Sequence, residues 1–326
     1  MIRKKFFSIT LYLILTIFLV SCSQSGSSDN ADEEHPDYPK QNIDIIAGGG
    51  PGGGTDVFAR AVGRELNDIL GVDVNIINKP GAAGSVASQE LDRLPSDGYT
   101  IMPTTTDLSI NIASDRTEDY LEKFDSLARF HQDTYLLFVQ DGSEYADIDT
   151  LLEEAKNNPG EITVGGTHSD GLDDLTIRQF EQETGIELNY TPYEESGKIR
   201  SDLVGGHVDV MIDQLGASGD LVEGGEIEPV IVFAEDRVDD YPDIPTTVEK
   251  DIDLTDGLDR GFVIKNDVPD DIKETLRDAL KEVYESDRYQ DFIEEQELDI
   301  KDAWLDGEEY DETLQSDVET YSSLLE

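Results

Sequence analysis

Hydrophobic positions in this chain recur with two spacings, and their alternation predicts strands that alternate with helices. In the first third of the chain, runs with strand or helical spacing follow one another at residues 43–46, 58–70, 72–77, 85–94 and 99–103. Strand, helix and strand in this order build a parallel sheet that is covered by helices. The first third therefore predicts an α/β unit.

Glycine-rich loops precede the helices of this unit. Residues 48–54 hold six glycines between an apolar run and a helical pattern, and residues 79–84 form a second such loop. We expect Thr55 to cap the first helix and Gly71 to end it. In a parallel sheet, ligands bind at the carboxyl ends of the strands, where both loops lie. Unpaired N–H groups and the positive end of the helix dipole at 48–56 therefore predict an anion site.

The same order of elements returns in the second half of the chain. A strand at 162–164 enters the glycine-containing loop 165–171, and a helix with apolar positions from Leu172 to Phe180 follows. Further strands are predicted at 135–139, 188–190, 208–212 and 230–233. Further helices are predicted at 148–157, 270–284, about 287–295 and 307–325, and one more between Ser196, as its cap, and Gly205-Gly206. Two similar α/β units, each with a glycine-rich helix start, predict two lobes with a ligand between them.

The N-terminus has the pattern of a lipoprotein signal peptide. Three basic residues precede an apolar run at 6–20, and Leu19-Val20-Ser21-Cys22 resembles a lipidation box. The alternative is a transmembrane helix, but an apolar run of about 15 residues is shorter than the roughly 20 that a bilayer requires. We therefore expect residues 1–21 to be removed and Cys22 to carry lipid. Residues 22–37 are then a flexible tether in the periplasm or at the outer face of the cell membrane.

The composition is strongly acidic. The 326 residues hold 74 Asp and Glu against 24 Lys and Arg, and removal of the three basic residues with the signal peptide takes the net charge from −50 to −53. Disorder is one interpretation, but the periodic helices and strands argue against it. The better interpretation is an acidic surface suited to molar salt. At 1 M salt the Debye length is about 3 Å, so the repulsion between surface carboxylates is largely screened. This charge excludes nucleic acid as a partner.

Patterns for catalysis and cofactor binding are weak. Gly48-x-Gly50-x-x-Gly53 has the form of the dinucleotide fingerprint, but the acidic residue about 20 positions later, Asp68, falls inside the expected helix. No lysine follows Gly54, as a P-loop would require. The four histidines and the single cysteine form no catalytic or metal-binding spacing, so no disulfide is expected either.

We therefore expect neither an enzyme nor a cofactor. A nucleotide- or phosphate-binding enzyme that uses the loop at 48–54 is kept as the alternative. His168, in the second glycine loop, is either a solvated loop residue or a ligand contact.

Short motifs occur in a specific order through nearly the whole chain after the tether. They are Tyr38-Pro39, Gly53-Gly54-Thr55-Asp56 with Ala59-Arg60, Asn78 to Gly84, Asp97-Gly98-Tyr99-Thr100, Pro159-Gly160, Pro192-Tyr193, Asp202 to Asp209 and Pro242 to Glu249. In this order and spacing they resemble the extracytoplasmic receptors of tripartite tricarboxylate transporters, the Bug-type receptors.

The resemblance implies a two-lobed periplasmic-binding-protein (Venus flytrap) fold, in which each lobe is a mostly parallel sheet covered by helices. It places lobe 1 at 38–138 plus 234–300, lobe 2 at 139–233 and a C-terminal helical segment at 301–326. Such a receptor binds a small organic carboxylate between its lobes and delivers it to membrane permease subunits. We expect a monomer. A binding module that feeds a sensor kinase is a further alternative.

The resemblance also implies the ligand site. One carboxylate group is expected at main-chain N–H groups of two facing loops, Gly53–Asp56 in lobe 1 and Thr167–Gly171 in lobe 2. Thr104 and Thr105 are expected as further polar contacts, and Asp213 and Gln214 as contacts to the distal end of the ligand. The candidate ligand-binding residues are therefore Gly53, Gly54, Thr55, Asp56, Thr104, Thr105, Thr167, His168, Ser169, Asp213 and Gln214.

Two departures from the family pattern lie at the expected cleft. Relatives often have a His-Leu pair at the start of the second lobe's helix, where this chain has Asp174-Leu175. The residues Thr104-Thr105-Thr106 replace a serine-rich tract. The ligand of a relative is therefore not transferred, and tri-, di- and aromatic monocarboxylates all stay open.

Overall fold

The computed structural model describes residues 38–117, 120–193, 196–255, 257–296, 298 and 303–325. The predicted signal peptide, the lipidation site Cys22 and the tether lie outside these residues. Among the helices within them, none combines the length and the apolar character that crossing a bilayer requires.

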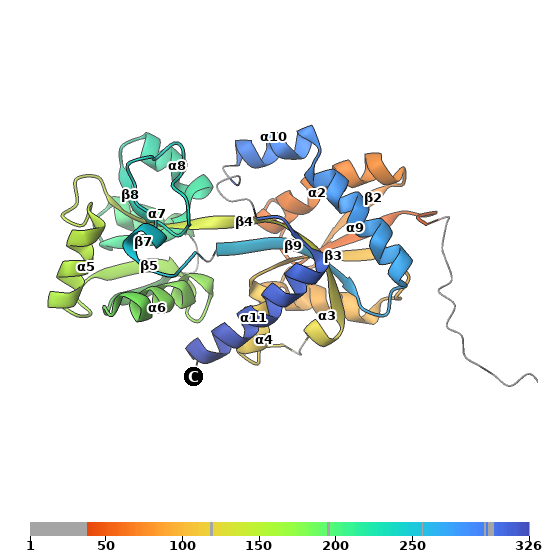
Figure 1. The fold of residues 1–326 in the computed structure, drawn as a ribbon, viewed down its shortest axis with the longest axis horizontal. Helices are drawn as coiled ribbons and strands as arrows, with labels where there is room; N and C mark the ends of the chain where they lie inside the picture. The colour runs from red at the N-terminus through yellow and green to blue at the C-terminus, as the bar shows by residue number, and fades with distance from the viewer. Residues whose placement is uncertain are drawn as a thin grey trace, which may run out of the picture. The chain divides into compact units, whose positions relative to one another are not determined.

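Strands and helices alternate along the described chain, as the hydrophobic pattern predicts (Figure 1). The strands are β1 (Ile43–Ala47), β2 (Val74–Asn78), β3 (Thr100–Thr105), β4 (Phe124–Gln140), β5 (Thr163–Thr167), β6 (Asn189–Tyr193), β7 (Val210–Gln214), β8 (Ile227–Val232), β9 (Gly257–Lys265) and β10 (Leu305–Asp306). The helices are α2 (Gly54–Leu70), α3 (Ser85–Arg93), α4 (Asp107–Ala113), α5 (Ile148–Asn157), α6 (Leu172–Thr184), α7 (Ser196–Val204), α8 (Leu215–Glu223), α9 (Asp270–Tyr284), α10 (Asp287–Glu295) and α11 (Gly307–Leu325).

The strands form a mixed sheet in the order β2-β1-β3-β9-β4-β7-β5-β6. Its two ends are parallel, because β1 pairs with β2 and β3, and β5 pairs with β6 and β7, in the same direction. The middle is antiparallel: β4 pairs with β9 along its first part and with β7 and β8 along its last part. The expected parallel units are thus present, and two antiparallel strands run between them (Figure 1).

Strand β9 and the first part of β4 are absent from the sequence-based prediction. The reason is that charged residues interrupt their apolar alternation. Arg129, for example, donates to the Asp259 carboxylate at 3.2 Å, and Asp259 is only 1% exposed. Pairing between charged side chains replaces the hydrophobic signal here, so the pattern alone does not show the strands.

Separate groups of buried side chains form the cores at the two ends of the sheet. In the first, helix α2 buries Phe58, Val62 and Leu66 against Ile45 and its neighbours. Each of these side chains contributes about 1.5–3 kcal/mol by leaving water. In the second, residues of β4, β5 and α6 pack together with Phe233. We call β1–β3 with α2–α4 the first lobe and β5–β8 with α5–α8 the second lobe.

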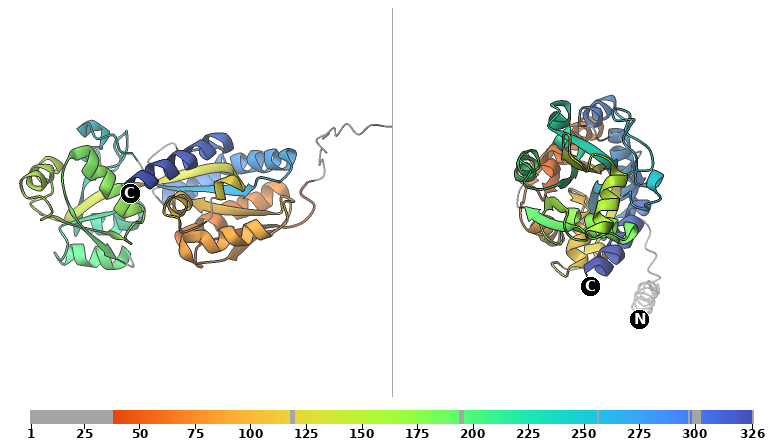
Figure 2. Two further views of the ribbon diagram at one scale, coloured as in Figure 1. Left: turned by 90° about the horizontal axis from the view of Figure 1, so that it is seen from below. Right: turned by 90° about the vertical axis from the view of Figure 1, so that its left-hand side faces the viewer.

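Helix α11 packs against both groups. Ser109 of α4 donates to the carbonyl of Leu314 at 3.1 Å, whereas Tyr321 near the end of α11 belongs to the core of the second lobe. Figure 2 shows α11 running along the sheet toward the second lobe. The predicted C-terminal helical segment is therefore an integral part of the packing.

One helix boundary differs from the prediction. Thr55 is not the N-cap of α2, because the helix begins at Gly54 and Gly53 is the capping residue, without a side-chain cap. The N–H of Gly53 donates to the carbonyl of Gly50 at 3.0 Å, so the glycine loop itself forms the turn that precedes the helix. Gly71 ends α2 in the left-handed conformation, as predicted, with a φ of 68°.

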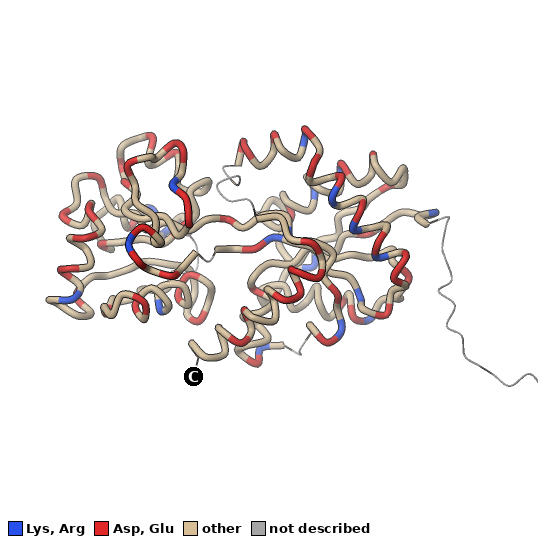
Figure 3. Tube along the Cα trace, viewed as in Figure 1, with Lys and Arg blue, Asp and Glu red and all other residues tan. Residues whose placement is uncertain are grey.

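Acidic residues are spread over the described chain. Figure 3 shows Asp and Glu on nearly every helix and connecting loop, with Lys and Arg in smaller numbers between them. This spread is the pattern of a solvated acidic surface rather than of one binding patch.

We expect the melting temperature to rise between 0.1 and 1 M NaCl, because salt screens the repulsion between these carboxylates. Each kcal/mol of relieved repulsion raises the melting temperature by roughly 2–4 °C in a protein of this size class. Calorimetry at a series of NaCl concentrations measures the effect, and sucrose at matched osmolarity is the control without screening. A melting temperature that is flat in NaCl would contradict the salt-adapted interpretation.

Candidate functional site

The Asp56 carboxylate orders the glycine loop at the start of α2. It is 2% exposed and accepts the N–H of Gly52 at 2.9 Å, two hydrogen bonds from the Arg60 guanidinium at 2.8 Å, and one from the Asn78 amide at 2.8 Å. Arg60 and the Gly52 N–H hold the pKa of Asp56 far below its usual value. These contacts show that the side chain holds the glycine loop in place.

The second lobe repeats this arrangement at the start of α6. The Asp174 carboxylate accepts the N–H of Asp170 at 2.8 Å and two hydrogen bonds from Arg178, at 3.1 and 2.8 Å. In both lobes the aspartate lies four residues after the N–H that it accepts and four before its arginine. The repeated spacing, at 52–60 and 170–178, is a signal for both arrangements that is present in the sequence.

Helix geometry leaves N–H donors at both loops. The first N–H of α2 that donates within the helix is that of Val57, to the carbonyl of Gly53. In α6 the equivalent bond runs from Leu175 to Gly171. The N–H groups of residues 54–56 and 172–174 lie before the first of these hydrogen bonds, so they have no acceptor within their own helix. The positive end of the helix dipole lies at the same residues.

The prediction is wrong for two of the main-chain donors in the second lobe. The N–H of Thr167 already donates to the Asp173 carboxylate at 2.7 Å, and that of His168 to the carbonyl of Tyr193 at 2.9 Å. These donors are used to hold the loop itself, which also contains two non-glycine residues with positive φ, His168 and Asp170. The donors that α6 offers therefore lie at its first turn, after the loop.

Two adjoining cavities bring most of the predicted residues together. One of about 200 Å³ is lined by Thr55, Thr104 and Thr105 among others, and one of about 610 Å³ by Thr167, His168, Ser169, Asp213 and Gln214 among others. Both cavities are lined by Ala83, Asp107 and Asn111, so they meet at these residues. Gly54 lines a third cavity of about 400 Å³, which Gln214 also lines, whereas Gly53 and Asp56 line none of the three.

Some predicted side chains are engaged within the protein. The Asp213 carboxylate accepts hydrogen bonds from Arg200 and Ser218 at 2.8 Å and from the N–H of Gln214 at 3.0 Å. Asp213 therefore fixes the end of β7, and Gln214 is the better candidate for a ligand contact. The Thr105 hydroxyl donates to Asp107 at 3.2 Å, whereas His168 and Ser169 are exposed at the cavity.

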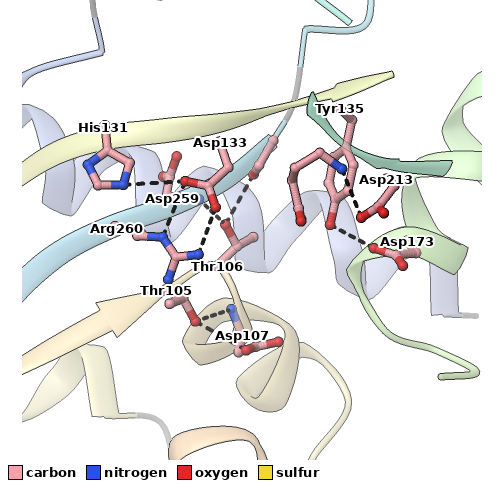
Figure 4. A network of polar contacts seen from close by, with 12 residues as sticks. Thr105, Thr106, Asp107, His131, Asp133, Tyr135, Asp173, Asp213, Asp259 and Arg260 are labelled. Carbon is pink, nitrogen blue, oxygen red and sulfur yellow. Dashed lines mark hydrogen bonds and ion pairs between the residues drawn. The ribbon is translucent and has the colours of Figure 1, made fainter. Parts of the chain in front are cut away.

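A buried charged network crosses the antiparallel middle of the sheet, and the sequence analysis missed it. Arg260 of β9 donates to the Asp133 carboxylate at 2.7 and 3.2 Å, and His131 lies 3.3 Å from the same carboxylate (Figure 4). Burial raises the pKa of Asp133, but Arg260 and His131 outweigh it and bring the value to about 2. Burial lowers the pKa of His131, whose other ring nitrogen lies 3.0 Å from the Tyr289 hydroxyl.

This network reaches the first glycine loop. A Cβ atom on Gly54 would lie 2.9 Å from an Arg260 nitrogen, so the guanidinium lies directly against this glycine. The Arg260 guanidinium, paired with Asp133, and the start of α2 thus lie close together at the third cavity, which Gly54 and Arg260 both line. Such an arrangement favours a nearby anion.

Comparison with known proteins identifies the family. Residues 58–325 match the family described as tripartite tricarboxylate transporter family receptor, TctC. The chain belongs to this family.

Solved structures of TctC-like proteins have the same fold. A TctC solute-binding protein from Polaromonas, without ligand, is 25% identical with a TM-score of 0.79 over 88% of this chain and 99% of that one. A Rhodopseudomonas palustris protein with adipate is 22% identical, with a TM-score of 0.70 over 88% and 97%. MatC from Rhodopseudomonas palustris with bound malate is 18% identical, with a TM-score of 0.70 over 89% and 100%.

The family assignment confirms the predicted periplasmic-binding-protein fold and the prediction that the chain is a receptor, not an enzyme. The alternative of a nucleotide-binding enzyme is wrong. Its acidic ribose partner, Asp68, lies within α2, where its carboxylate is 3.4 Å from Arg288. A ribose partner belongs at the end of the following strand. The TctC receptor is thus an extracytoplasmic solute-binding protein.

Proposed function

We propose that this TctC receptor binds a small organic carboxylate between its two lobes and delivers it to a tripartite tricarboxylate transporter permease. The observation that carries the proposal is the adjoining pair of cavities, which is lined by Thr55 in the first lobe and by Ser169 in the second. Beside them lie the starts of α2 and α6, where Asp56 and Asp174 each hold the preceding loop by a hydrogen bond, which we call the Asp56 and Asp174 clamps. The adipate and malate held by the two Rhodopseudomonas palustris proteins support a carboxylate as ligand.

In this proposal the first turn of α2 is the main anchor. The N–H groups of Thr55 and Asp56 donate to one carboxylate oxygen, with Thr104 and Thr105 nearby, and Arg260 adds positive potential to the same helix start. In the second lobe, Ser169 and the first turn of α6 replace the predicted Thr167 and His168 amides. The Asp56 and Asp174 clamps keep both helix starts in place.

Closure of the two lobes on the ligand is the proposed motion. Strand β4 pairs with β9 along its first part and with β7 and β8 along its last part, so it connects the two lobes. In this proposal the chain bends near Val139 and Phe233. The ligand drives closure only as far as it binds the closed form better than the open one.

A thermal-shift screen of organic acids in 2 M NaCl tests the proposal. At a concentration 100 times its dissociation constant, a ligand stabilises the folded protein by about 2.7 kcal/mol, so a cognate carboxylate raises the melting temperature clearly. Inorganic phosphate and a nucleotide are the comparison ligands. If no carboxylate raises the melting temperature, the proposed function fails.

The partner of the receptor is a separate part of the proposal. Genes for one very large and one small multispanning membrane protein beside the gene for this chain support a permease. A neighbouring sensor kinase gene without them supports the alternative module that feeds a kinase.

We also propose that Cys22 carries the lipid that holds the receptor at the membrane. Replacing Cys22 by serine is expected to move nearly all of the protein from the membrane fraction to the soluble fraction, because a lipid attached through a thioether at Cys22 is the only anchor in this proposal. Fractionation by ultracentrifugation, with Ser23→Ala as the control, measures this. Membrane association that survives in the Cys22→Ser variant would refute the lipid anchor.

A further inference from the structure

Asp107 lies where the two ligand cavities meet. It is the first residue of α4, directly after β3, and it lines both the 200 Å³ and the 610 Å³ cavity. Its carboxylate accepts the Thr105 hydroxyl at 3.2 Å, and its own N–H donates back to that hydroxyl at 3.3 Å (Figure 4). Thr105 thus fixes the side chain at the edge of both cavities.

Among the described residues, Thr105 is the only hydrogen-bond donor to the Asp107 carboxylate, and no basic side chain lies within ion-pair distance of it. The nearest basic side chains act from farther away. Arg260 is paired with Asp133, Arg116 donates to the carbonyl of Asp170 at 3.2 Å, and His168 is on the facing loop. Burial raises the pKa of Asp107 even though these groups and Thr105 oppose the rise.

The other acids of the larger cavity differ from Asp107. Asp173 accepts three hydrogen bonds, from the Tyr135 hydroxyl at 2.7 Å and from the N–H and hydroxyl of Thr167 at 2.7 Å. Asp213 is paired with Arg200. Asp107 is therefore the carboxylate of this cavity that has no ion pair and accepts the fewest hydrogen bonds among the described residues, and it lines the space that the ligand would occupy.

We propose that Asp107 selects ligands that carry a protonated amine beside their carboxylate, that is, amino acids or related amino carboxylates. This inference rests on the proposed function. The helix starts of α2 and α6 take the carboxylate, and the ammonium group supplies the charge partner that Asp107 lacks. A ligand with a second carboxylate at this point would be repelled instead. Asp107 therefore favours ligands with an ammonium group here and disfavours ligands with a carboxylate here.

Matched ligands of equal carbon skeleton test the inference. The panel has three sets, and each set holds an unsubstituted acid, its hydroxy acid and its amino acid. The sets are succinate, malate and aspartate; propionate, lactate and alanine; and glutarate, 2-hydroxyglutarate and glutamate. Every affinity is measured by calorimetry in 2 M NaCl. In the skeleton that binds, the amino acid is expected to bind at least about tenfold more tightly than the unsubstituted acid. The hydroxy acid is expected to lie between them.

The variant Asp107→Asn removes the charge and keeps an oxygen acceptor. It is expected to lower the preference for the amino acid over the unsubstituted acid by about tenfold, while the hydroxy acid keeps its affinity. Asp287→Asn is the matched control, because Asp287 is also the first residue of a helix but is exposed and lines none of the three cavities described above. It should leave every affinity unchanged.

The outcomes separate this inference from the proposed function. If unsubstituted or hydroxy acids bind as tightly as amino acids, or if the preference survives Asp107→Asn, the role of Asp107 is refuted and the carboxylate receptor stands. If no member of the panel and no other carboxylate binds, the proposed function itself fails and the inference falls with it.

Discussion

Replacing Asp133 by alanine is expected to destabilise the protein by about 3–5 kcal/mol. The change leaves the Arg260 guanidinium buried without its partner, next to the start of α2. An unpaired buried charge is among the most destabilising changes that a single substitution can make. Urea unfolding at fixed salt measures the loss through the midpoint of the transition.

Two controls show whether the effect comes from the unpaired charge. The double variant Asp133→Leu with Arg260→Met removes both charges and is expected to recover most of the lost stability. Glu249→Ala breaks the exposed pair with Arg237, whose side chains are both 41% exposed, and should change the stability by less than about 1 kcal/mol. A single variant at Asp133 that behaves like Glu249→Ala would contradict the argument.

The same pair has a consequence for the pH dependence of stability. The pKa of Asp133 is about 2 in the folded protein against a usual 3.8. Because the folded-state value is lowered, the contribution of Asp133 is fully present above pH 4 and is lost as the pH falls toward 2. In the double variant this part of the acid destabilisation should disappear.

Replacing Asp56 by alanine is expected to weaken carboxylate binding by about 1–3 kcal/mol. The substitution removes the acceptor for the Gly52 N–H, for Arg60 and for Asn78. The glycine loop then loses the bonds that set the direction of the first α2 donors, although Asp56 lines none of the cavities. Calorimetric titration with the tightest carboxylate from the screen measures the change.

Matched variants separate loop order from general destabilisation. Asp174→Ala removes the equivalent clamp in the second lobe, where Arg178 and the Asp170 N–H are its partners, and should also weaken binding. Asp68→Ala, on an exposed part of the same helix α2, should leave binding unchanged. Unchanged affinity in Asp56→Ala would remove this residue from the binding machinery.

Local patterns were sufficient to predict much of the fold. The apolar spacing places α9, α10 and α11 correctly, and Gly71 ends α2 in the left-handed conformation, as predicted. These features depend on neighbours within a few residues along the chain. A periodic helix or a glycine stop is therefore visible before any tertiary contact is known.

The donors of the second loop could not be predicted in the same way. Residues 165–171 look like a second anion loop, yet the N–H groups of Thr167 and His168 are bound to Asp173 and Tyr193. Tyr193 belongs to β6, which pairs with β5 in parallel. The acceptor of the His168 N–H therefore lies on a neighbouring strand, and the sequence around the loop does not contain it, whereas the acceptor of the Thr167 N–H, Asp173, lies six residues along the chain.

The sequence by itself determined the alternation of strands and helices, the glycine-rich helix starts and the family, because each depends on residues near one another or on the order of short motifs. Only the tertiary structure decided which charges pair in the middle of the sheet and which acid of the cavity has no ion pair. Asp133 meets Arg260 from another strand, 127 residues away, whereas no basic side chain in the described part of the chain lies within ion-pair distance of Asp107. Electrostatic interactions act through space, so the order of residues along the chain does not determine them.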